Sequence, residues 1–208
     1  MNPWLKVPYK DYVQHMSHAG VYQFQVLNAV FKKTLKSVQP SSVLVLGCGG
    51  GNGFEHIDPQ VTSSVTGIDI NECYLEHCDA QFGNKGYNLE LHARDMNSDH
   101  VQYANSFDLV TCYLFLEYVD IERVLNQILP SMKKSSVLNI VIQQNNKCQF
   151  VSDTGVRSLS ELASVAKEIR ENELENALAR SDFEIVEKDI VELPNGKAFV
   201  AYVCELGK

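Results

Sequence analysis

The sequence lacks the features of a secreted, membrane-spanning or disulfide-bonded protein. Its six cysteines, at positions 48, 73, 78, 112, 148 and 204, include no C-x-x-C pair and no cysteine–histidine cluster at zinc spacing. The N-terminus has no charged-then-apolar signal pattern, and no apolar run approaches about 18 residues. We therefore expect a reduced, cytoplasmic protein that needs no metal and does not bind a membrane.

An excess of positive charge is also absent. Lys and Arg number 18 against 26 Asp and Glu, which gives a net charge of -8. A nucleic-acid backbone is therefore not an expected partner. With 208 residues, 45% of them apolar, and no repeat or linker, the chain is long enough for one sizeable domain. We predict a single domain over 1–208, with a helical N-terminal cap region over 1–40 and a core over 41–208.

The glycines gather at one point of the chain. Four apolar residues at 43–46 lead into a loop with glycine at five of the seven positions 47–53. A continuous apolar run is typical of a strand buried on both faces of a parallel sheet. Glycines directly after such a strand let the backbone approach a ligand closely. In open α/β sheets, ligands bind outside the carboxyl ends of the strands, so this loop is the predicted ligand site.

The remaining pattern predicts alternating strands and helices. Apolar spacing indicates a helix over 21–38, a helix between Asn71 and Gly83, and a helix from Asp120 with an apolar stripe that reaches Met132. Ser158 and Glu161 form a capping-box pattern for one long helix, or two, ending near 181. Further strands are expected at 65–70, 89–93, 107–113, 136–142, 184–193 and 197–205. Because Asn195-Gly196 is a hairpin signal, we expect an α/β fold with a doubly wound, mostly parallel seven-stranded sheet and a C-terminal antiparallel hairpin.

Spacing within the glycine loop separates the nucleotide-type ligands. A phosphate-binding P-loop needs a lysine after the glycines, and none follows here. A dinucleotide-binding loop needs a third small residue to pack its helix against the strand. Asn52 or Phe54 stands at that position, depending on which glycine begins the motif. Both spacings therefore argue against a dinucleotide.

Glycine instead recurs at alternate positions, at Gly47, Gly49, Gly51 and Gly53. In this spacing the chain resembles the class I S-adenosylmethionine-dependent methyltransferases, over nearly its whole length. The segment 12–16 resembles one in small, single-domain bacterial members of that family. The resemblance implies a Rossmann-like methyltransferase fold and S-adenosyl-L-methionine as cofactor, with the backbone of the four glycines around its amino-acid and ribose parts.

The resemblance also implies the rest of a cofactor pocket. Asp69, at the end of the second strand, would bind both ribose hydroxyls, since one carboxylate can accept two O–H bonds. Asp95, after the third strand, would take the adenine amino group between Ile70 and Met96. Either aspartate could instead only begin a helix. Two cysteines at strand ends, Cys48 and Cys112, would lie beside the cofactor, and we interpret them as small fillers rather than nucleophiles.

The methyl acceptor is less well defined. Candidate pocket residues are His15, Tyr22, Tyr113, Glu117 and Tyr118, although His15 could be structural and Glu117 and Tyr118 could begin a surface helix. The sequence identifies no catalytic residue, since the family's chemistry mainly needs the nucleophile held in line. The motifs of nucleobase modifiers are missing after residue 110, which favours a small-molecule acceptor over nucleic acid, with a protein side chain left open. Two alternatives are a non-catalytic cofactor-binding or partner-binding relative and a dinucleotide-dependent oxidoreductase.

Overall fold

A computed structural model describes residues 2–99, 103 and 106–207, which form one seven-stranded sheet. The strand order is β3-β2-β1-β4-β5-β7-β6. Strands β1 to β5 pair in parallel, and β7 is antiparallel to both of its neighbours. In chain order, from β1 to β7, the strands are Ser42–Leu46, Ser64–Asp69, Asn88–Ala93, Phe107–Tyr113, Met132–Gln144, Phe183–Glu192 and Ala198–Leu206. The predicted fold, including the closing hairpin, is confirmed.

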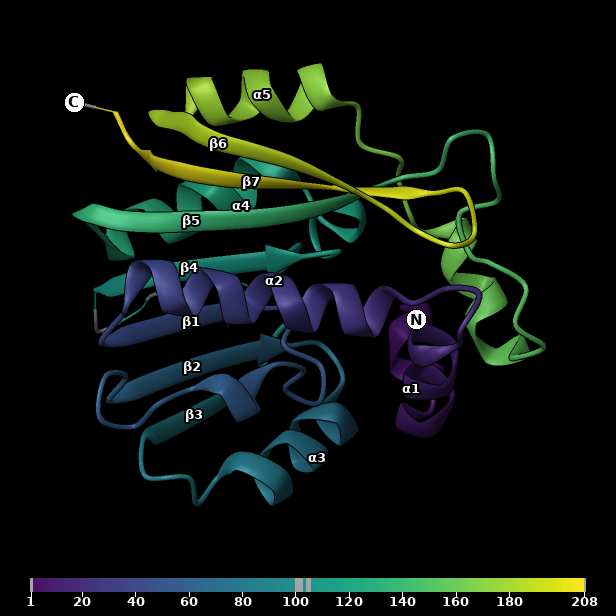
Figure 1. Ribbon diagram of the computed structural model, residues 1–208, viewed down its shortest axis with the longest axis horizontal. Coiled ribbons are helices and arrows are strands. Elements are labelled where there is room, and N and C mark those ends of the chain that lie inside the picture. The colour runs from purple at the N-terminus through teal and green to yellow at the C-terminus, as the bar shows by residue number, and fades with distance from the viewer. Residues whose placement is uncertain (1, 100–102, 104–105, 208) are drawn as a thin grey trace.

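Helices cover both faces of the sheet (Figure 1). Helices α2 (Gln23–Val38) and α3 (Glu72–Phe82) pack on one face, where Phe31 and Phe82 join the apolar side chains of β1. Helices α4 (Ile121–Ile128) and α5 (Glu171–Arg180) pack on the other face through residues such as Leu125 and Leu178. The central strand β1 is buried along its whole length, as its unbroken apolar run predicts. No helix in the described ranges is long and apolar enough to span a bilayer.

The carboxyl ends of the parallel strands are covered by a cap made from two distant parts of the chain. The cap consists of η1 (Pro3–Lys6), α1 (Tyr9–Ser17) and η5 (Arg157–Ser164), to the right of the sheet in Figure 1. Val7 packs against Leu159 and Leu162 in an apolar cluster that holds the two parts together. The cap therefore closes the edge of the sheet at which the glycine loop emerges.

Two local predictions from the sequence are wrong. The helix after Asp120 ends at Ile128, because Pro130 cannot donate to a helical ladder, and Met132 begins β5 instead of extending the helical stripe. The capping box at Ser158 does not form either. The Ser158 hydroxyl donates to Asp11 Oδ2 of α1 at 2.7 Å, and the segment becomes the 3-10 helix η5 before α5, so the two-helix alternative holds.

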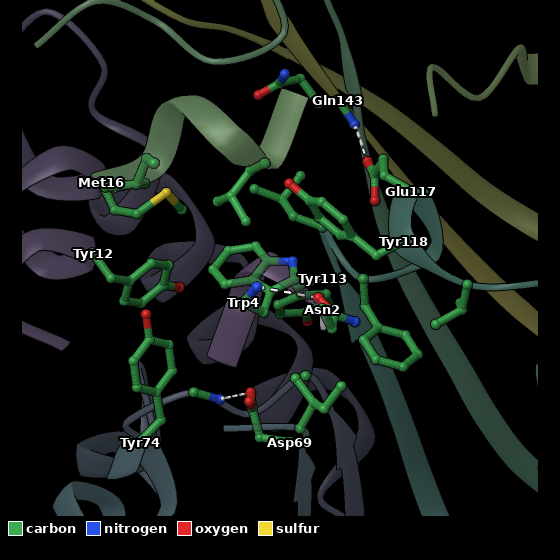
Figure 2. Close-up of a pocket in the computed structure, with 18 of the residues that line it drawn as sticks. Asn2, Trp4, Tyr12, Met16, Asp69, Tyr74, Tyr113, Glu117, Tyr118 and Gln143 are labelled. Atoms are coloured by element: carbon green, nitrogen blue, oxygen red, sulfur yellow. Dashed lines mark hydrogen bonds between the residues drawn. The ribbon is translucent and has the colours of Figure 1, made fainter. Parts of the chain in front are cut away.

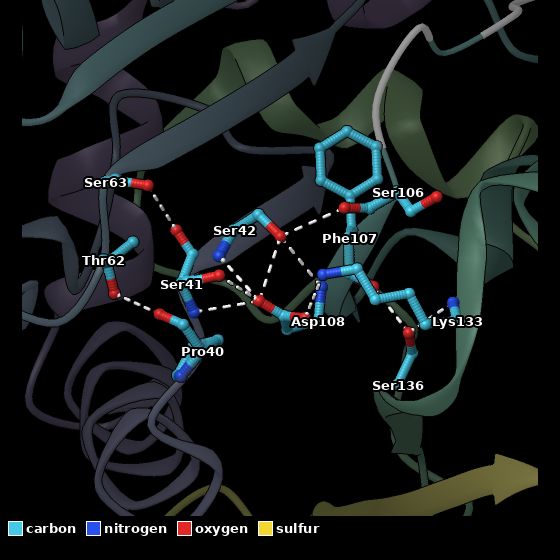
Figure 3. A network of polar contacts seen from close by, with 10 residues as sticks. All are labelled: Pro40, Ser41, Ser42, Thr62, Ser63, Ser106, Phe107, Asp108, Lys133 and Ser136. Carbon is cyan, nitrogen blue, oxygen red and sulfur yellow. Dashed lines mark hydrogen bonds and ion pairs between the residues drawn. The ribbon is translucent and has the colours of Figure 1, made fainter.

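The opposite edge of the sheet is tied together by one carboxylate (Figure 3). Asp108 Oδ2 accepts hydrogen bonds from the backbone N–H groups of Ser41 and Ser42, at 3.0 and 3.1 Å, and Oδ1 lies 2.5 Å from Lys133 Nζ. Burial acts to raise the pKa of Asp108, but Lys133 and the two serines outweigh it and lower the pKa to about 2. This network joins the amino ends of β1, β4 and β5, far from the glycine loop, so the two edges have separate roles.

Candidate functional site

A cavity of about 1050 Å³, counted with its open mouth, lies between the carboxyl ends of the strands and the cap. Figure 2 shows Trp4 and Tyr118 near its centre, with Asp69 on one side and Glu117 on the other. The strand order fixes this arrangement. Residues after β2 and β3 lie at one end of the cavity, and those after β4 and β5 lie at the other.

The first half of the glycine loop faces the cavity. Gly47 and Gly49 line it, with φ angles of 69° and 53° that favour glycine. A Cβ on Gly47 would come within 2.8 Å of the Phe115 ring. The Gly49 N–H donates to Asp69 Oδ2 at 2.9 Å, so the loop and the end of β2 are joined at the surface of the cavity.

The second half of the loop faces the core instead. A Cβ on Gly51 would lie 2.9 Å from Cys78 Sγ and 2.9 Å from the Phe82 ring, and one on Gly53 would lie 2.7 Å from the Phe31 ring. Neither glycine lines the cavity. The alternating glycines therefore have two structural uses, because one pair opens the backbone to the cavity and the other lets α2 and α3 pack closely.

Asp69 is the carboxylate beside the loop. Its Oδ1 accepts a hydrogen bond from the Asn71 N–H at 2.9 Å, while Oδ2 is held by Gly49. Burial raises the pKa of this carboxyl above its usual range, and the backbone N–H donors of Asn71, Gly49 and Ile70 counteract part of that effect. Asn71 also caps α3 and donates to the Trp4 carbonyl oxygen at 2.8 Å, so this corner is bound to the cap.

The expected adenine region lies next to Asp69. Ile70, Asp95 and Met96 all line the cavity, and Met96 is buried. Asp95 Oδ1 accepts from the Asn97 N–H at 3.0 Å, which is the local turn that a helix-entry residue makes. The structure thus brings the predicted residues together while it also gives Asp95 a structural bond.

The chain turns sharply where β4 ends. Leu114 adopts a left-handed φ of 50°, and its N–H donates to the Val141 oxygen of β5 at 2.8 Å. The turn directs Phe115, Glu117 and Tyr118 toward the cavity, which all three line. A residue other than glycine in this conformation is strained, and such strain is common where side chains are positioned for function.

Glu117 is a fully buried carboxylate at this end of the cavity. Its Oε1 accepts from the Gln143 N–H at 2.8 Å, beyond the last paired residues of β4 and β5 (Figure 2). No protein group within the described part of the chain bonds to its Oε2. Burial raises the pKa of Glu117 to about 7, although the backbone donors act against the rise. This carboxyl therefore exchanges its proton near neutral pH.

His15 lines the same end but stays uncharged. Its Nδ1 lies 2.8 Å from Thr154 Oγ1, and its side chain is buried. Burial, aided by Lys197 and His18, lowers the pKa of His15 to about 4. At neutral pH the imidazole is neutral, so it is a weak base.

Besides Gly51 and Gly53, three predicted residues do not reach the cavity, and a further one reaches it only in part. Tyr22 is 46% exposed at the start of α2 and lies outside the cavity lining. Cys48 and Cys112 are buried in the two cores, as expected of small fillers. Tyr113 lines the cavity, but its hydroxyl hydrogen-bonds to Asn139 Oδ1 in the sheet, so this polar end is already occupied.

Several cavity residues have no counterpart in the sequence prediction, namely Trp4, Tyr12, Tyr74, Gln143 and Phe150. Trp4 and Tyr12 belong to an N-terminal segment rich in aromatic residues, and that richness is the sequence signal from which these two could have been predicted. Gln143 and Phe150 could not be found, because they stand in a polar stretch that gives no periodic pattern. No group of three or more potential metal ligands occurs among the described residues.

Comparisons with known proteins agree with the fold. A family model described as "Methyltransferase domain" matches residues 43–135. Ubiquinone biosynthesis O-methyltransferases from Aromatoleum aromaticum and Bordetella avium are each 35% identical to the chain, over 77 and 83 residues, or 37% and 40% of it. The chain spans only 32% and 34% of the length of these curated relatives.

Among solved structures, the N-methyltransferase NodS from Bradyrhizobium japonicum, in complex with S-adenosyl-L-homocysteine, matches the fold over 100% of both chains. Its TM-score is 0.69, at 14% identity. The family model thus identifies a methyltransferase domain over residues 43–135, and the solved structure shows that the whole chain has the fold of a methyltransferase.

Proposed function

We propose that the protein is an S-adenosylmethionine-dependent methyltransferase that acts on a small-molecule acceptor. The observation that carries the proposal is the junction of Asp69 with Gly49 at the cavity surface. A carboxylate beside a glycine backbone offers acceptors for hydroxyl groups and close backbone approach in one place. The cytoplasmic setting and the lack of a nucleic-acid partner remain predictions from the sequence.

The residues present fit such a cofactor. A Cβ on Gly47 would collide with the Phe115 ring at the cavity surface, so only glycine leaves this backbone open, and the half-buried Asp69 carboxylate beside the loop accepts one backbone N–H at each oxygen. We assign the ribose hydroxyls to Asp69, and the adenine ring to the space between Ile70 and Met96, with its amino group toward Asp95. Gly47 and Gly49 would hold the amino-acid part, next to Tyr12, whose ring comes within 3.8 Å of a Cβ built on Gly49. Gly51 and Gly53 would not contact the cofactor, and they let the loop pack closely against α3 and α2.

When bound, the cofactor supplies an activated methyl group on a positively charged sulfur. The protein must then hold the acceptor in line and exclude water. The cap does both, because η1, α1 and η5 enclose the cavity and bring Trp4, Tyr12 and Leu162 into it. The chain matches only about a third of the length of the curated relatives, so their acceptor is not carried over to it. We place the acceptor of this protein at the end of the cavity that Glu117 and His15 line.

Calorimetric titration with S-adenosylmethionine and S-adenosylhomocysteine tests the proposal. We expect both to bind, and Asp69→Ala to weaken binding by about tenfold or more, because two charge-assisted hydrogen bonds are lost. Asp79→Ala is the matched control, since Asp79 lies exposed on α3 and outside the cavity lining. No heat with either compound, or equal affinities in the Asp69 and Asp79 variants, would overturn the assignment.

A further inference from the structure

The end of the cavity beyond β4 and β5 has a defined chemical character. We name it the acceptor end, formed by the cavity-lining residues of α1, α2, η3 (Leu116–Tyr118), β5, η5 and the segment that joins β5 to η5. Its surface is mostly apolar, with Met16, Leu27, Phe150, Leu159 and Leu162. Of the described residues that line the whole cavity, Arg94 is the one Lys or Arg, and it follows β3 at the opposite end.

This composition selects against an anionic acceptor. An anionic carboxylate or phosphate would find no cation at the acceptor end, and burying an unpaired charge costs far more than burying a neutral polar group. His15 does not supply a charge, since burial keeps it neutral at physiological pH. The apolar surface instead suits a neutral, largely aromatic or aliphatic body.

One polar group at the acceptor end lacks a partner. Glu117 is 0% exposed, and its Oε2 bonds to no protein group in the described part of the chain. In Figure 2 this oxygen points away from Gln143, on the side of the Tyr118 ring. A buried carboxylate oxygen without a donor is costly, so a donor brought by a ligand would be strongly favoured. A hydroxyl is such a donor, and because it is neutral it enters an apolar cavity without the cost of removing a charge from water.

We propose that Glu117 holds and deprotonates the methyl acceptor, and that the acceptor is a neutral, largely apolar molecule bearing a hydroxyl group. This inference rests on the proposed function. In the reaction, the acceptor O–H bond breaks and its proton passes to Glu117 Oε2. The oxygen's electron pair forms the new O–CH₃ bond, and the pair of the broken C–S bond stays on sulfur. The positive charge of the sulfonium and the negative charge of the carboxylate disappear together, so charge and atoms balance.

The titratable groups that sense the charge of Glu117 keep their own protonation state across the neutral pH range. Tyr118, its neighbour on η3, and Cys112 on β4 are the titratable groups that sense its charge. Burial raises the pKa of both far above the neutral range. From β5 only the uncharged Gln143 N–H meets the carboxylate, and from the segment before α5 the Lys167 N–H donates to the Glu117 main-chain oxygen at 2.8 Å. A pH dependence between 6 and 8 would therefore report Glu117 itself.

The test compares three ligands that share one phenol ring. We would titrate p-cresol, 4-hydroxybenzoate and tyramine into protein saturated with S-adenosylhomocysteine, by calorimetry. The expected result is that p-cresol binds about tenfold or more tightly than the anionic 4-hydroxybenzoate, and at least as tightly as the cationic tyramine. In wild type, p-cresol affinity should rise from pH 6 to pH 8 as the carboxyl ionises.

Glu117→Gln should weaken p-cresol binding by about tenfold or more and remove its pH dependence, while the affinity for S-adenosylhomocysteine stays unchanged. Glu122→Gln, which changes an exposed carboxylate of α4, should match wild type. The inference is overturned if 4-hydroxybenzoate or tyramine binds more tightly, if none of the three binds, or if p-cresol affinity responds to neither Glu117→Gln nor pH. A protein that fails to bind S-adenosylhomocysteine would instead overturn the proposed function.

Discussion

The Trp4 indole meets the Tyr118 ring edge-on, with the ring centroids 5.1 Å apart, in the middle of the cavity. The two residues come from opposite parts of the site, since Trp4 belongs to the cap and Tyr118 follows β4. Asn71 fixes the Trp4 main chain from the side of Asp69. A ligand that extends from Asp69 toward Glu117 must therefore pass close to this ring pair.

Trp4 is the only tryptophan in the sequence, so its fluorescence reports the cavity directly. We expect S-adenosylhomocysteine to shift or quench the Trp4 emission, with the same midpoint as the calorimetric titration. Trp4→Phe should keep the binding heat and lose the optical signal. Binding heat in wild type without any change in emission would contradict the placement of the ligand beside Trp4.

The second half of the glycine loop makes a prediction about stability. Gly51→Ala should destabilise the fold by roughly 2 to 4 kcal/mol, because the new Cβ is strained at a φ of 82° and collides with Cys78 and Phe82. Chemical denaturation would measure the change.

Gly155→Ala is the matched control for Gly51→Ala. Gly155 has a similar φ of 75° but nothing within 4 Å of its added Cβ, so it should cost only about 1 kcal/mol, from strain alone. Equal losses in the two variants would show that Gly51 serves the turn and not the packing against α3.

Glu117 gives the fold a pH dependence of known sign. Its pKa rises from 4.5 to about 7 on folding, so the folded state binds a proton more tightly than the unfolded chain. The stability is then greatest below pH 4.5 and is lost as the pH rises through 7. Between pH 5 and 8 the loss should be roughly 2 to 3 kcal/mol for this single group.

The control for this dependence is Glu117→Gln, which keeps an acceptor for the Gln143 N–H and has no proton to exchange. The difference in unfolding free energy between wild type and this variant should fall by the same amount from pH 5 to pH 8. A difference that stays constant over that range would mean that the carboxyl is not desolvated.

The sheet and much of the ligand-binding edge could be predicted from the sequence. Periodicity and β-branched runs determine strands locally, and the carboxyl-edge rule then places Gly47, Gly49, Asp69 and Glu117 along the same edge of the sheet. The alternating glycines misled in one respect. Their common spacing suggested a common role, whereas Gly51 faces the core, and only the position of α3 reveals this.

The cap could not be predicted because its contacts join segments far apart in sequence. The capping box at Ser158 is locally plausible, but the hydroxyl bonds to Asp11, 147 residues away, and the segment folds as a 3-10 helix. Tyr22 failed as a pocket residue for a related reason. A left-handed φ of 57° at the start of α2 leaves its ring at the surface, and nothing in the local sequence signals that turn.

The most direct measurement is a crystal structure of the protein with S-adenosylhomocysteine. The account predicts the ribose hydroxyls within hydrogen-bond distance of the Asp69 carboxylate, the adenine ring between Ile70 and Met96, and the sulfur facing the end of the cavity that Glu117 lines. A ligand bound elsewhere, or one in this cavity whose ribose does not contact Asp69, would contradict it.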